Sequence, residues 1–540
     1  MSSGKSTSVS RQLHGTERWA CRTTFGSLRA ELNSAEGTIV ASDAFQNIEP
    51  ALLWQHFDAL VKVPRPSKQE APAIDHLVEW AEQHSFSWQK DAAGNLAVHV
   101  PATAGSDQTP TVILQSHVDI VVSNAEDAPD GVDAAVGKIP VVRAHCDHGG
   151  TCTEAADGDW LWAPYTTLGA DNGLGVVSAM AAAEETEHGP LILLFTVDEE
   201  EGLTGARKLD PSLLDGGQYL INLDSEDDDV FTIGCAGGLD TEIQWTSERT
   251  SLDGGWVTFR LKVDGCKGGH SGVEIDQARA NANRLLARWL DLLSAESAVR
   301  IHRITGGDRR NAIPRSAECI VSIPADAESS IQQLTDRLQS ELKPHFAGRD
   351  EGINLQAQSS DEAEPAYSTE ASSRLIKLLL GLPDGVAGVC PEVSDLVETS
   401  NNMALVSTSG DTVSIVCSSR SSSPFALQEM GRRVQIIAEL AGGSAKATNG
   451  YPGWKPRFDS PLTALCVDVY ESVFGQKPTV ESIHAGLECG AILANKPELD
   501  AASVGPTIRG NHAPGERVSI SSVQKFYQFL AATLQKIAAG

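Results

Sequence analysis

Several short apolar runs in this chain end in histidine or acidic residues, and such positions can carry chemistry. The run VILQSHVDIV, residues 112–121, predicts a buried strand with His117 and Asp119 two positions apart near its end. Because alternate residues of a strand point to the same face, an imidazole and a carboxylate would lie side by side. A histidine that binds a metal usually has its second ring nitrogen held by such a carboxylate. Taken alone, the pair is more typical of a strand-end histidine beside a solvated aspartate.

Two further apolar runs end in carboxylates. The run LLFTVDEEEG leads into Asp198, Glu199, Glu200 and Glu201, and YLINLDSEDDD places Asp224 directly after an apolar strand. Adjacent glutamates at a cleft can take different tasks, because one can bind a metal ion while the other serves as a general base. The sequence therefore favours an acidic site at the ends of these strands.

Asp171 and His512 complete a possible donor set. Asp171 lies in TTLGADNGLGV before an Asn-Gly turn, where an aspartate is usually a helix cap or a turn former. His512 lies in the Gly/Pro-flanked loop GPTIRGNHAPGE. Two histidines with several carboxylates form a mixed nitrogen and oxygen ligand set that zinc accepts, and a shared carboxylate would allow two ions. Two such ions can activate a water and polarise a carbonyl. The chain shows no nucleophile elbow, Walker A loop or Rossmann glycine fingerprint.

The elements that must position these residues alternate between strand and helix. The strand patterns NLAVHV, VILQSHVDIV, PLILLFTVDEEEG and GQYLINLDSED are accompanied by helical patterns such as NGLGVVSAMAAAEE. This alternation predicts an α/β fold with a mostly parallel sheet flanked by helices. Ligands of such sheets gather at the carboxyl ends of the strands. The residues that fall there are His117, Asp119, Glu199, Glu200 and Asp224.

The sequence pattern changes near residue 238. TEIQWTSE and GWVTFRLKVDG alternate with period two, as antiparallel strands do, and MALVSTSGDTVSIVCS predicts a hairpin around Ser409-Gly410. Helical patterns lie between them, so we expect an α+β domain that interrupts the first domain. The expected divisions are an N-terminal extension at 1–45, a catalytic domain at 46–237 and 446–540, and a lid domain at 238–445.

The composition limits the kinds of binding partner and the cellular compartment that we expect for this protein. The chain has 540 residues and a net charge of −30, so nucleic acid and anionic membranes would repel it. No apolar run approaches the ~18 residues of a membrane span. Ten cysteines without a C-x-x-C pair favour a reduced compartment, and we expect a cytoplasmic protein. The first ~40 residues are Ser/Thr-rich and basic, so a mitochondrial or other organellar transit peptide is the alternative to a disordered tail.

Residues 131–159 form a polar, Gly-rich loop without a firm structural signal. The loop carries His145, Cys146, His148 and Cys152, which could hold a third metal ion. Their irregular spacing is a poor match to a zinc finger, so a surface insertion is the favoured interpretation.

Read in order, the characteristic motifs are SHVDIV, TLGADNGLGV, TVDEEEG, INLDSED, CAGG, KGGHSG, RNAIPR, HAGLECG and GPTIRGNHAPGE. This ordered set resembles the aminoacyl-histidine dipeptidases, also called peptidase D, Xaa-His dipeptidase or bacterial carnosinase. They belong to a wider group of di-zinc metallopeptidases that includes aminoacylase and carboxypeptidase G. The resemblance covers residues 46–540, and GLECG together with NAIPR favours the histidyl-dipeptidase branch.

The resemblance implies a ligand set for two metal ions. His117, Asp171 and Asp224 would hold one zinc ion. Asp171, Glu200 and His512 would hold the other, so Asp171 would bridge the two ions. Cobalt or manganese could replace zinc in both positions.

The resemblance also implies roles around the metal ions. Glu199 would be the general base and later the acid that protonates the leaving amine, and Asp119 would orient His117. His270, in KGGHSG of the lid, would polarise the scissile carbonyl. The remaining expected residues are Asn311 and Arg420, which would bind the terminal carboxylate of the substrate, and Gly486 and Glu488, which would line its pocket.

The implied activity is zinc-dependent hydrolysis of Xaa-His dipeptides, including β-alanyl-histidine, by an enzyme that forms a homodimer through its lid. A dipeptidase of other specificity, or an amidohydrolase acting on N-acylated amino acids, would share the metal set and differ only in the pocket. A third hypothesis is an inactive homologue that serves as a binding protein. Such a protein would lack a ligand or the base, and this sequence has all of them.

Overall fold

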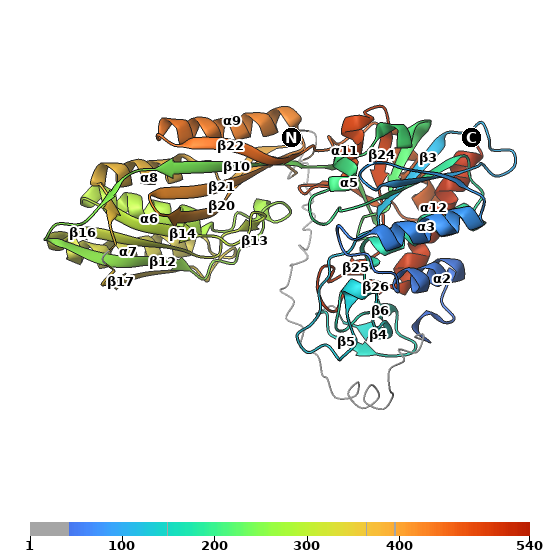
Figure 1. Ribbon diagram of the computed structural model, residues 1–540, viewed down its shortest axis with the longest axis horizontal. Coiled ribbons are helices and arrows are strands. Elements are labelled where there is room, and N and C mark those ends of the chain that lie inside the picture. Colours follow the sequence, from blue (N-terminus) through green and yellow to red (C-terminus); the bar gives the residue numbers. More distant parts are fainter. Residues whose placement is uncertain (1–42, 148, 363, 392, 394–395) are drawn as a thin grey trace, which may run out of the picture.

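The computed structural model describes residues 43–147, 149–362, 364–391, 393 and 396–540. The N-terminal extension, with the transit-peptide hypothesis, lies almost entirely outside the described residues. The described chain forms two bodies with separate sheets, a catalytic body at the right of Figure 1 and a lid at the left. No helix in the described ranges is long and apolar enough to cross a membrane.

The catalytic body is built on a sheet of eight strands. In spatial order these are β1 (Ser87–Lys90), β2 (Leu96–Val100), β7 (Leu191–Thr196), β3 (Thr111–His117), β8 (Gly217–Asn222), β24 (Asp500–Ser503), β9 (Val230–Cys235) and β23 (Thr479–Ile483). The central strands β7, β3, β8 and β24 are parallel to one another, and β9 is parallel to β23. The other pairs are antiparallel. The predicted α/β fold with a mostly parallel sheet is therefore confirmed.

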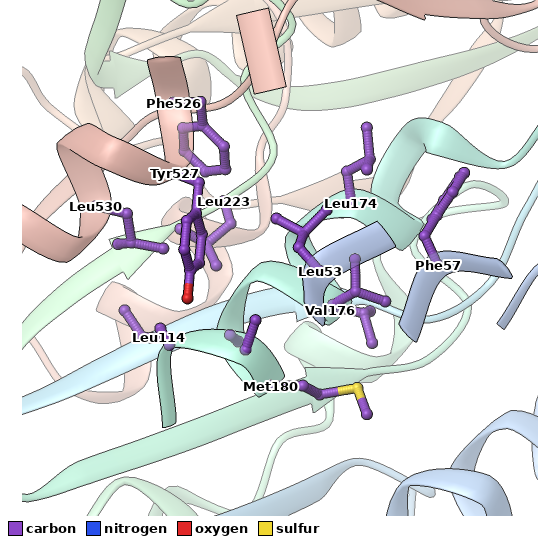
Figure 2. Close-up of a cluster of buried hydrophobic side chains, with 14 of the residues drawn as sticks. Leu53, Phe57, Leu114, Leu174, Val176, Met180, Leu223, Phe526, Tyr527 and Leu530 are labelled. Atoms are coloured by element: carbon purple, nitrogen blue, oxygen red, sulfur yellow. The ribbon is translucent and has the colours of Figure 1, made fainter. Parts of the chain in front are cut away.

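Helices cover both faces of this sheet. Alternate side chains of β3 enter different cores, Val112 and Leu114 one of them and Ile113 the other. The first core is closed by α2 (Ala51–Leu60), α3 (Ala71–Gln83), α4 (Ala170–Glu185), α10 (Pro461–Phe474) and α12 (Ile520–Ala538). The second is closed by α5 (Thr204–Arg207), the 3-10 helix η4 (Pro211–Leu214) and α11 (Glu488–Asn495). Figure 2 shows apolar side chains of α2, α4 and α12 gathered beside Leu114 in the first core. This packing fixes α4, whose first turn carries Asp171.

The lid is a separate antiparallel sheet with helices packed on it. Its strands are β17 (Asn354–Ser359), β12 (Trp256–Asp264), β16 (Ala317–Pro324), β14 (Arg300–Gly306), β20 (Val397–Ser409), β21 (Thr412–Ser421), β10 (Gly237–Thr246) and β22 (Ser444–Tyr451), with β19 (Gly385–Val389) beside β20. Its helices are α6 (Ala282–Glu296), α7 (Glu328–His345), α8 (Thr369–Gly381) and α9 (Pro424–Leu440). The predicted hairpin is confirmed, because Ser409 pairs with Thr412 across a turn in which Gly410 has φ 55°. Strand β22 runs past the expected boundary at residue 445 and pairs with β10.

Polar side chains fix where five of these helices begin. The hydroxyls of Ser368, Ser423, Ser460 and Ser519 accept a backbone N–H of α8, α9, α10 and α12, and Asn281 does the same for α6. Such caps satisfy N–H groups that a helix leaves unpaired at its first turn. Helix α4 is different, because its N-cap is Gly169, with φ 72° and no side-chain cap.

The loop at 131–159 contains more structure than the sequence indicated. Strands β4 (Val142–Cys146), β5 (Cys152–Glu154) and β6 (Trp160–Trp162) join β25 (Ile508–Arg509) and β26 (Arg517–Ser519) in a small antiparallel sheet. These strands are short, and the sheet is completed by the pairing of β6 with β26 near the C-terminus, so the sequence pattern did not reveal it. Cys146 and Cys152 form a disulfide across the β4–β5 hairpin, with Cα atoms 4.1 Å apart.

The disulfide corrects two expectations. The prediction that the cysteines are reduced is wrong for this pair, because the hairpin brings two residues of irregular spacing face to face. A third metal site with both cysteines as ligands is also excluded in this state, and His148 lies outside the described residues.

The remaining short elements are η2 (Asp43–Phe45), η3 (Ala134–Val136), η5 (Ile275–Gln277), η6 (Ala325–Ala327), the pair β11 (Arg249–Thr250) and β18 (Ala366–Tyr367), and the pair β13 (Gly269–His270) and β15 (Ala312–Ile313).

Candidate metal centre and substrate-binding residues

The predicted ligand residues meet at the carboxyl edge of the central parallel strands. His117 is the last residue of β3, Glu200 follows β7, and Asp224 follows β8. Asp171 comes from the first turn of α4, and His512 comes from the loop between β25 and β26. Residues that are far apart in the sequence therefore present ligand atoms to one another.

Asp171 lies between the two histidines. Its Oδ1 is 3.1 Å from His117 Nε2, and its Oδ2 is 3.2 Å from His512 Nε2. Asp224 Oδ1 lies 3.3 Å from His117 Nε2, and Glu200 Oε2 lies 2.9 Å from His512 Nε2. The cluster thus divides into two groups of ligands that share the carboxylate of Asp171.

These contacts fit a pair of bound metal ions. Ligand atoms that share one ion through bonds of ~2 Å lie about 3 Å apart, as the atoms in both groups do. Glu200 Oε1 is buried and has no hydrogen-bond partner among the described residues, which suits an oxygen directed at an ion. His117, Asp171 and Glu200 each offer a ligand atom, and these atoms lie within 4.8 Å of one another. The donor set is therefore suited to a dinuclear centre with nitrogen and oxygen ligands.

Asp119 lies behind His117, although β3 ends at His117 rather than at residue 121. His117 Nδ1 is 3.1 Å from the backbone oxygen of Asp119 and 3.5 Å from its carboxylate Oδ1. A proton on Nδ1, donated to these oxygens, leaves the Nε2 lone pair free for a metal ion. The Asp119 carboxylate also accepts the backbone N–H groups of Glu199 at 3.0 Å and Glu200 at 3.3 Å. One carboxylate thereby holds both His117 and the acidic segment.

The electrostatics of the cluster favour added positive charge. Burial raises the pKa of Asp224 to about 6, although His117 opposes the shift. Burial also raises the pKa of Glu199 well above its usual range; His117 opposes this shift, and Asp224 and Glu200 add to it. Bonds to Asp171 and Glu200 raise the pKa of His512 to about 11. The chain therefore retains protons at this edge, and bound cations would supply the same charge in their place.

Arg420, one of the predicted substrate-binding residues of the lid, is a buried charged group. It lies on β21 and is 7% exposed, and its Nη1 donates to Tyr451 Oη at 2.9 Å. Its Nε has no hydrogen-bond partner among the described residues. A guanidinium with an unused N–H is suited to a carboxylate ligand. No described hydrogen bond joins Arg420 to the metal ligands.

His270, on β13, is an uncharged hydrogen-bond donor. Its Nδ1 accepts the backbone N–H groups of Gly272 and Val273, each at 3.2 Å. The ring proton is therefore on Nε2. Burial and the nearby Arg420 lower the pKa of His270 to about 4, so the ring carries no charge at neutral pH.

Gly486 and Asn311 border the same region. A Cβ atom at Gly486 would lie 2.8 Å from the ring of Tyr451, so only glycine leaves room for the tyrosine that binds Arg420. Asn311 is exposed next to β15, and its backbone oxygen accepts the N–H of Ser271 at 2.8 Å. The structure thus brings Gly486 and Arg420 together around Tyr451, and joins Asn311 to the residue after His270.

Glu488, which is expected to line a substrate pocket, lies in the buried interior of the catalytic body. Glu488 is 0% exposed, and its Oε2 accepts from Gln115 Nε2 and Thr196 Oγ1, each at 2.6 Å. Gln115 Oε1 in turn accepts from Asn222 Nδ2 at 2.7 Å. The first turn of α11 packs onto the sheet and carries Glu488 beneath the strand ends, which the motif HAGLECG could not indicate. The resulting buried layer ties β3, β7 and β8 together below the metal ligands.

Two residues that the sequence analysis did not select enclose the turn that carries Asp171. They are Arg65 and Glu516, which are 1% and 2% exposed. Glu516 lies four positions after His512 in GNHAPGE, and this proximity is the one feature of the sequence that could have connected Glu516 with the site. Arg65 lies in VPRPS, where nothing local connects it with the site.

The comparisons with known proteins agree with this geometry. Residues 261–350 match the family described as a peptidase dimerisation domain. The cytosol non-specific dipeptidase of Escherichia coli K12 is 35% identical, over 91% of this chain and 99% of that protein. The crystal structure of aminoacylhistidine dipeptidase from Vibrio alginolyticus is 36% identical with a TM-score of 0.82, over 91% of this chain and 98% of that one. A tripeptidase structure from Staphylococcus aureus, at 15% identity and a TM-score of 0.50 over 91% and 100% of the chains, shares the fold.

The fold, the clustered donors and these relatives define a metallopeptidase with an inserted dimerisation domain. The chain belongs to the M20 family of peptidases, as a metallo-dipeptidase of the cytosol non-specific dipeptidase type. The resemblance found in the ordered motifs is therefore confirmed.

Proposed function

We propose that this enzyme hydrolyses Xaa-His dipeptides, including β-alanyl-histidine, with two zinc ions bound at the shared cluster. His117, Asp171 and Asp224 hold one ion, and Asp171, Glu200 and His512 hold the other. The observation that carries the proposal is the placement of Asp171, which offers one oxygen to each histidine at 3.1 and 3.2 Å. The substrate class follows the aminoacylhistidine dipeptidase that this chain resembles at 36% identity.

Glu199 is the general base in this proposal. Bound zinc ions would supply a Lewis acid and lower the pKa of a water. Glu199 takes the proton of the attacking water and later gives it to the leaving amine. Burial raises the pKa of its carboxyl group, which favours the protonated form once a proton has arrived. Asp119 is a positioning residue that fixes the ring of His117 and the backbone of Glu199.

The lid supplies the groups that hold the substrate. His270 donates its Nε2–H to the carbonyl oxygen as negative charge develops there. Arg420 and Asn311 bind the terminal carboxylate, and Arg420 has a buried N–H without a described partner for this purpose. Gly486 leaves the space in which Tyr451 orients the Arg420 guanidinium.

We further propose that the lid comprises residues 237–451 and forms a homodimer. The peptidase dimerisation domain matched at 261–350 supports the dimer. The pairing of β22 with β10 supports an end at Tyr451 rather than at residue 445, and the catalytic domain then comprises residues 46–236 and 452–540. His270 and Arg420 belong to the same lid, and Arg420 lies close enough to His270 to lower its pKa, so one lid can supply both residues to one active site.

A substrate panel tests this proposal directly. Histidine release from β-alanyl-histidine and glycyl-histidine would be measured as isolated, after chelation, and after zinc is restored. Leucyl-glycine and an N-acetyl amino acid would be assayed in parallel. We expect loss on chelation and recovery with zinc on the histidyl dipeptides. Zinc-dependent activity on the acetylated substrate alone would contradict the proposed specificity, and activity that survives complete metal removal would contradict the proposed site.

A further inference from the structure

The turn that presents Asp171 is enclosed by two buried charged side chains. Arg65 and Glu516 lie on either side of residues 168–171, and both are almost completely buried. Neither is a proposed metal ligand. A buried charge is costly unless hydrogen bonds compensate it, so the contacts of each show what it does here.

Glu516 binds the backbone of the turn through both carboxylate oxygens. Its Oε2 accepts the N–H groups of Leu168 at 2.7 Å and Gly169 at 3.0 Å. Its Oε1 accepts those of Ala170 at 2.8 Å and Asp171 at 3.3 Å. These N–H groups precede the regular part of α4, because Asp171 and Asn172 have non-helical dihedral angles and Asn172 Oδ1 accepts the N–H of Gly175. Glu516 therefore satisfies the N–H groups of this turn from a distant segment and fixes the backbone of Asp171 itself.

Arg65 binds the carbonyl groups around the same turn. Its Nη2 donates to the oxygen of Gly169 at 2.6 Å, and its Nη1 donates to the oxygen of Val118 at 3.0 Å. A Cβ atom at Gly169 would lie 2.5 Å from Nη2, and one at Gly173 would lie 2.7 Å from it. The two glycines of GADNG thus make room for the guanidinium.

Together the two side chains connect the segments that carry three ligands. Arg65 joins the turn of Asp171 to Val118, the residue after His117. Glu516 joins the same turn to the loop of His512. The distance from the Asp171 carboxylate to each histidine therefore depends on both charged groups, although neither touches the histidines.

We propose that Arg65 and Glu516 are positioning residues that hold the bridging carboxylate in register with the two histidines and thereby set the affinity for metal. This inference rests on the proposed metal site. Removing the Glu516 charge leaves N–H groups of the turn unpaired and lets Asp171 move relative to both histidines. Outer residues that orient metal ligands typically contribute ten- to a hundred-fold in metal affinity.

The test is zinc affinity, measured by competition with a chromophoric chelator on the full-length protein after metal removal. In Glu516→Gln, an amide NH₂ group opposes two of the backbone N–H groups, and we expect zinc to bind roughly ten- to a hundred-fold more weakly. In Arg65→Lys the charge remains but the two directed bonds cannot both form, and we expect weaker zinc binding as well. If Glu516→Gln does not fold, Arg65→Lys decides by the same measurement.

Asp350→Asn is the matched control. Asp350 is a buried lid carboxylate, 3% exposed, that accepts the backbone N–H groups of Lys267 and Ala280. We expect this variant to lose thermal stability in the metal-free form and to bind zinc as the wild type does. Zinc affinity within about twofold of wild type in both Glu516→Gln and Arg65→Lys would overturn the proposal and leave the pair a purely structural role. Failure of the wild type to bind zinc would instead overturn the metal site on which the proposal rests.

Discussion

The carboxyl edge of the catalytic sheet and the rim of the lid hold their functional groups in different ways. At the sheet edge, the ligand side chains lie 2.9 to 3.3 Å from one another and rest on a buried polar layer. At the lid rim, His270 is held by its own loop and Arg420 by Tyr451. No described hydrogen bond joins the rim to the ligands. The sheet edge is therefore preformed, whereas the proposed role of the lid residues requires a bound substrate.

Because of this difference, we expect substitutions in the two regions to have different effects. A change at the sheet edge should alter the stability of the protein or the rate of its reaction, whichever substrate is used. A change at the lid rim should alter only the recognition of groups that a particular substrate carries.

The largest effect is expected for Glu199→Gln. The amide cannot take a proton from the attacking water, so kcat should fall by roughly a thousand-fold or more on every substrate. Zinc content, measured by elemental analysis, should remain near that of the wild type. The matched control is Glu201→Gln, because Glu201 is 57% exposed and pairs with Lys68 at the surface. Near-wild-type kcat in Glu199→Gln would show that another group is the base.

A smaller effect is expected for Glu488→Gln, on stability rather than rate. Burial raises the pKa of Glu488 from 4.5 to about 7, so the folded chain keeps a proton that the unfolded chain releases. The free energy of unfolding should therefore fall as pH rises from about 4.5 to about 7, by up to about 3 kcal/mol. The glutamine variant has no such proton, and its stability should fall less over this range. Thermal unfolding of the metal-free proteins at pH 5 and pH 8 measures the difference. Parallel pH dependence in both proteins would show that Glu488 is not neutral when folded.

The smallest effect is expected for Arg420→Lys at the lid rim. Lysine keeps the charge but cannot bind a carboxylate through two parallel N–H groups, so KM for a dipeptide should rise about tenfold with little change in kcat. The same comparison with the dipeptide amide, which lacks the carboxylate, should show almost no difference between variant and wild type. Arg432→Lys, on the exposed side of α9, is the control. An equal loss on acid and amide would contradict the role of Arg420 and the division between rim and sheet edge.

Much of the site could be predicted because its residue types stand at the ends of apolar strands. His117 ends a buried strand and the acids Glu200 and Asp224 follow two others, and parallel strands bring their carboxyl ends to one edge. The burial of Glu488 could not be predicted because it depends on how α11 packs on the sheet. The small sheet around β4 was missed because its strands are short and because β6 pairs with β26, which is distant in the sequence.

The sequence by itself determined the chemistry of the donor set, the alternation of strand and helix, and the peptidase family, since residue type and hydrophobic period are local properties. The tertiary structure alone decided that Asp171 lies between His117 and His512, that Cys146 meets Cys152, and that Arg65 and Glu516 enclose one turn. Apart from the disulfide, whose cysteines are six positions apart, these relations join segments separated by up to hundreds of residues. Their distances are set by how the sheet, α4 and the C-terminal loop pack together, and no local pattern encodes that packing.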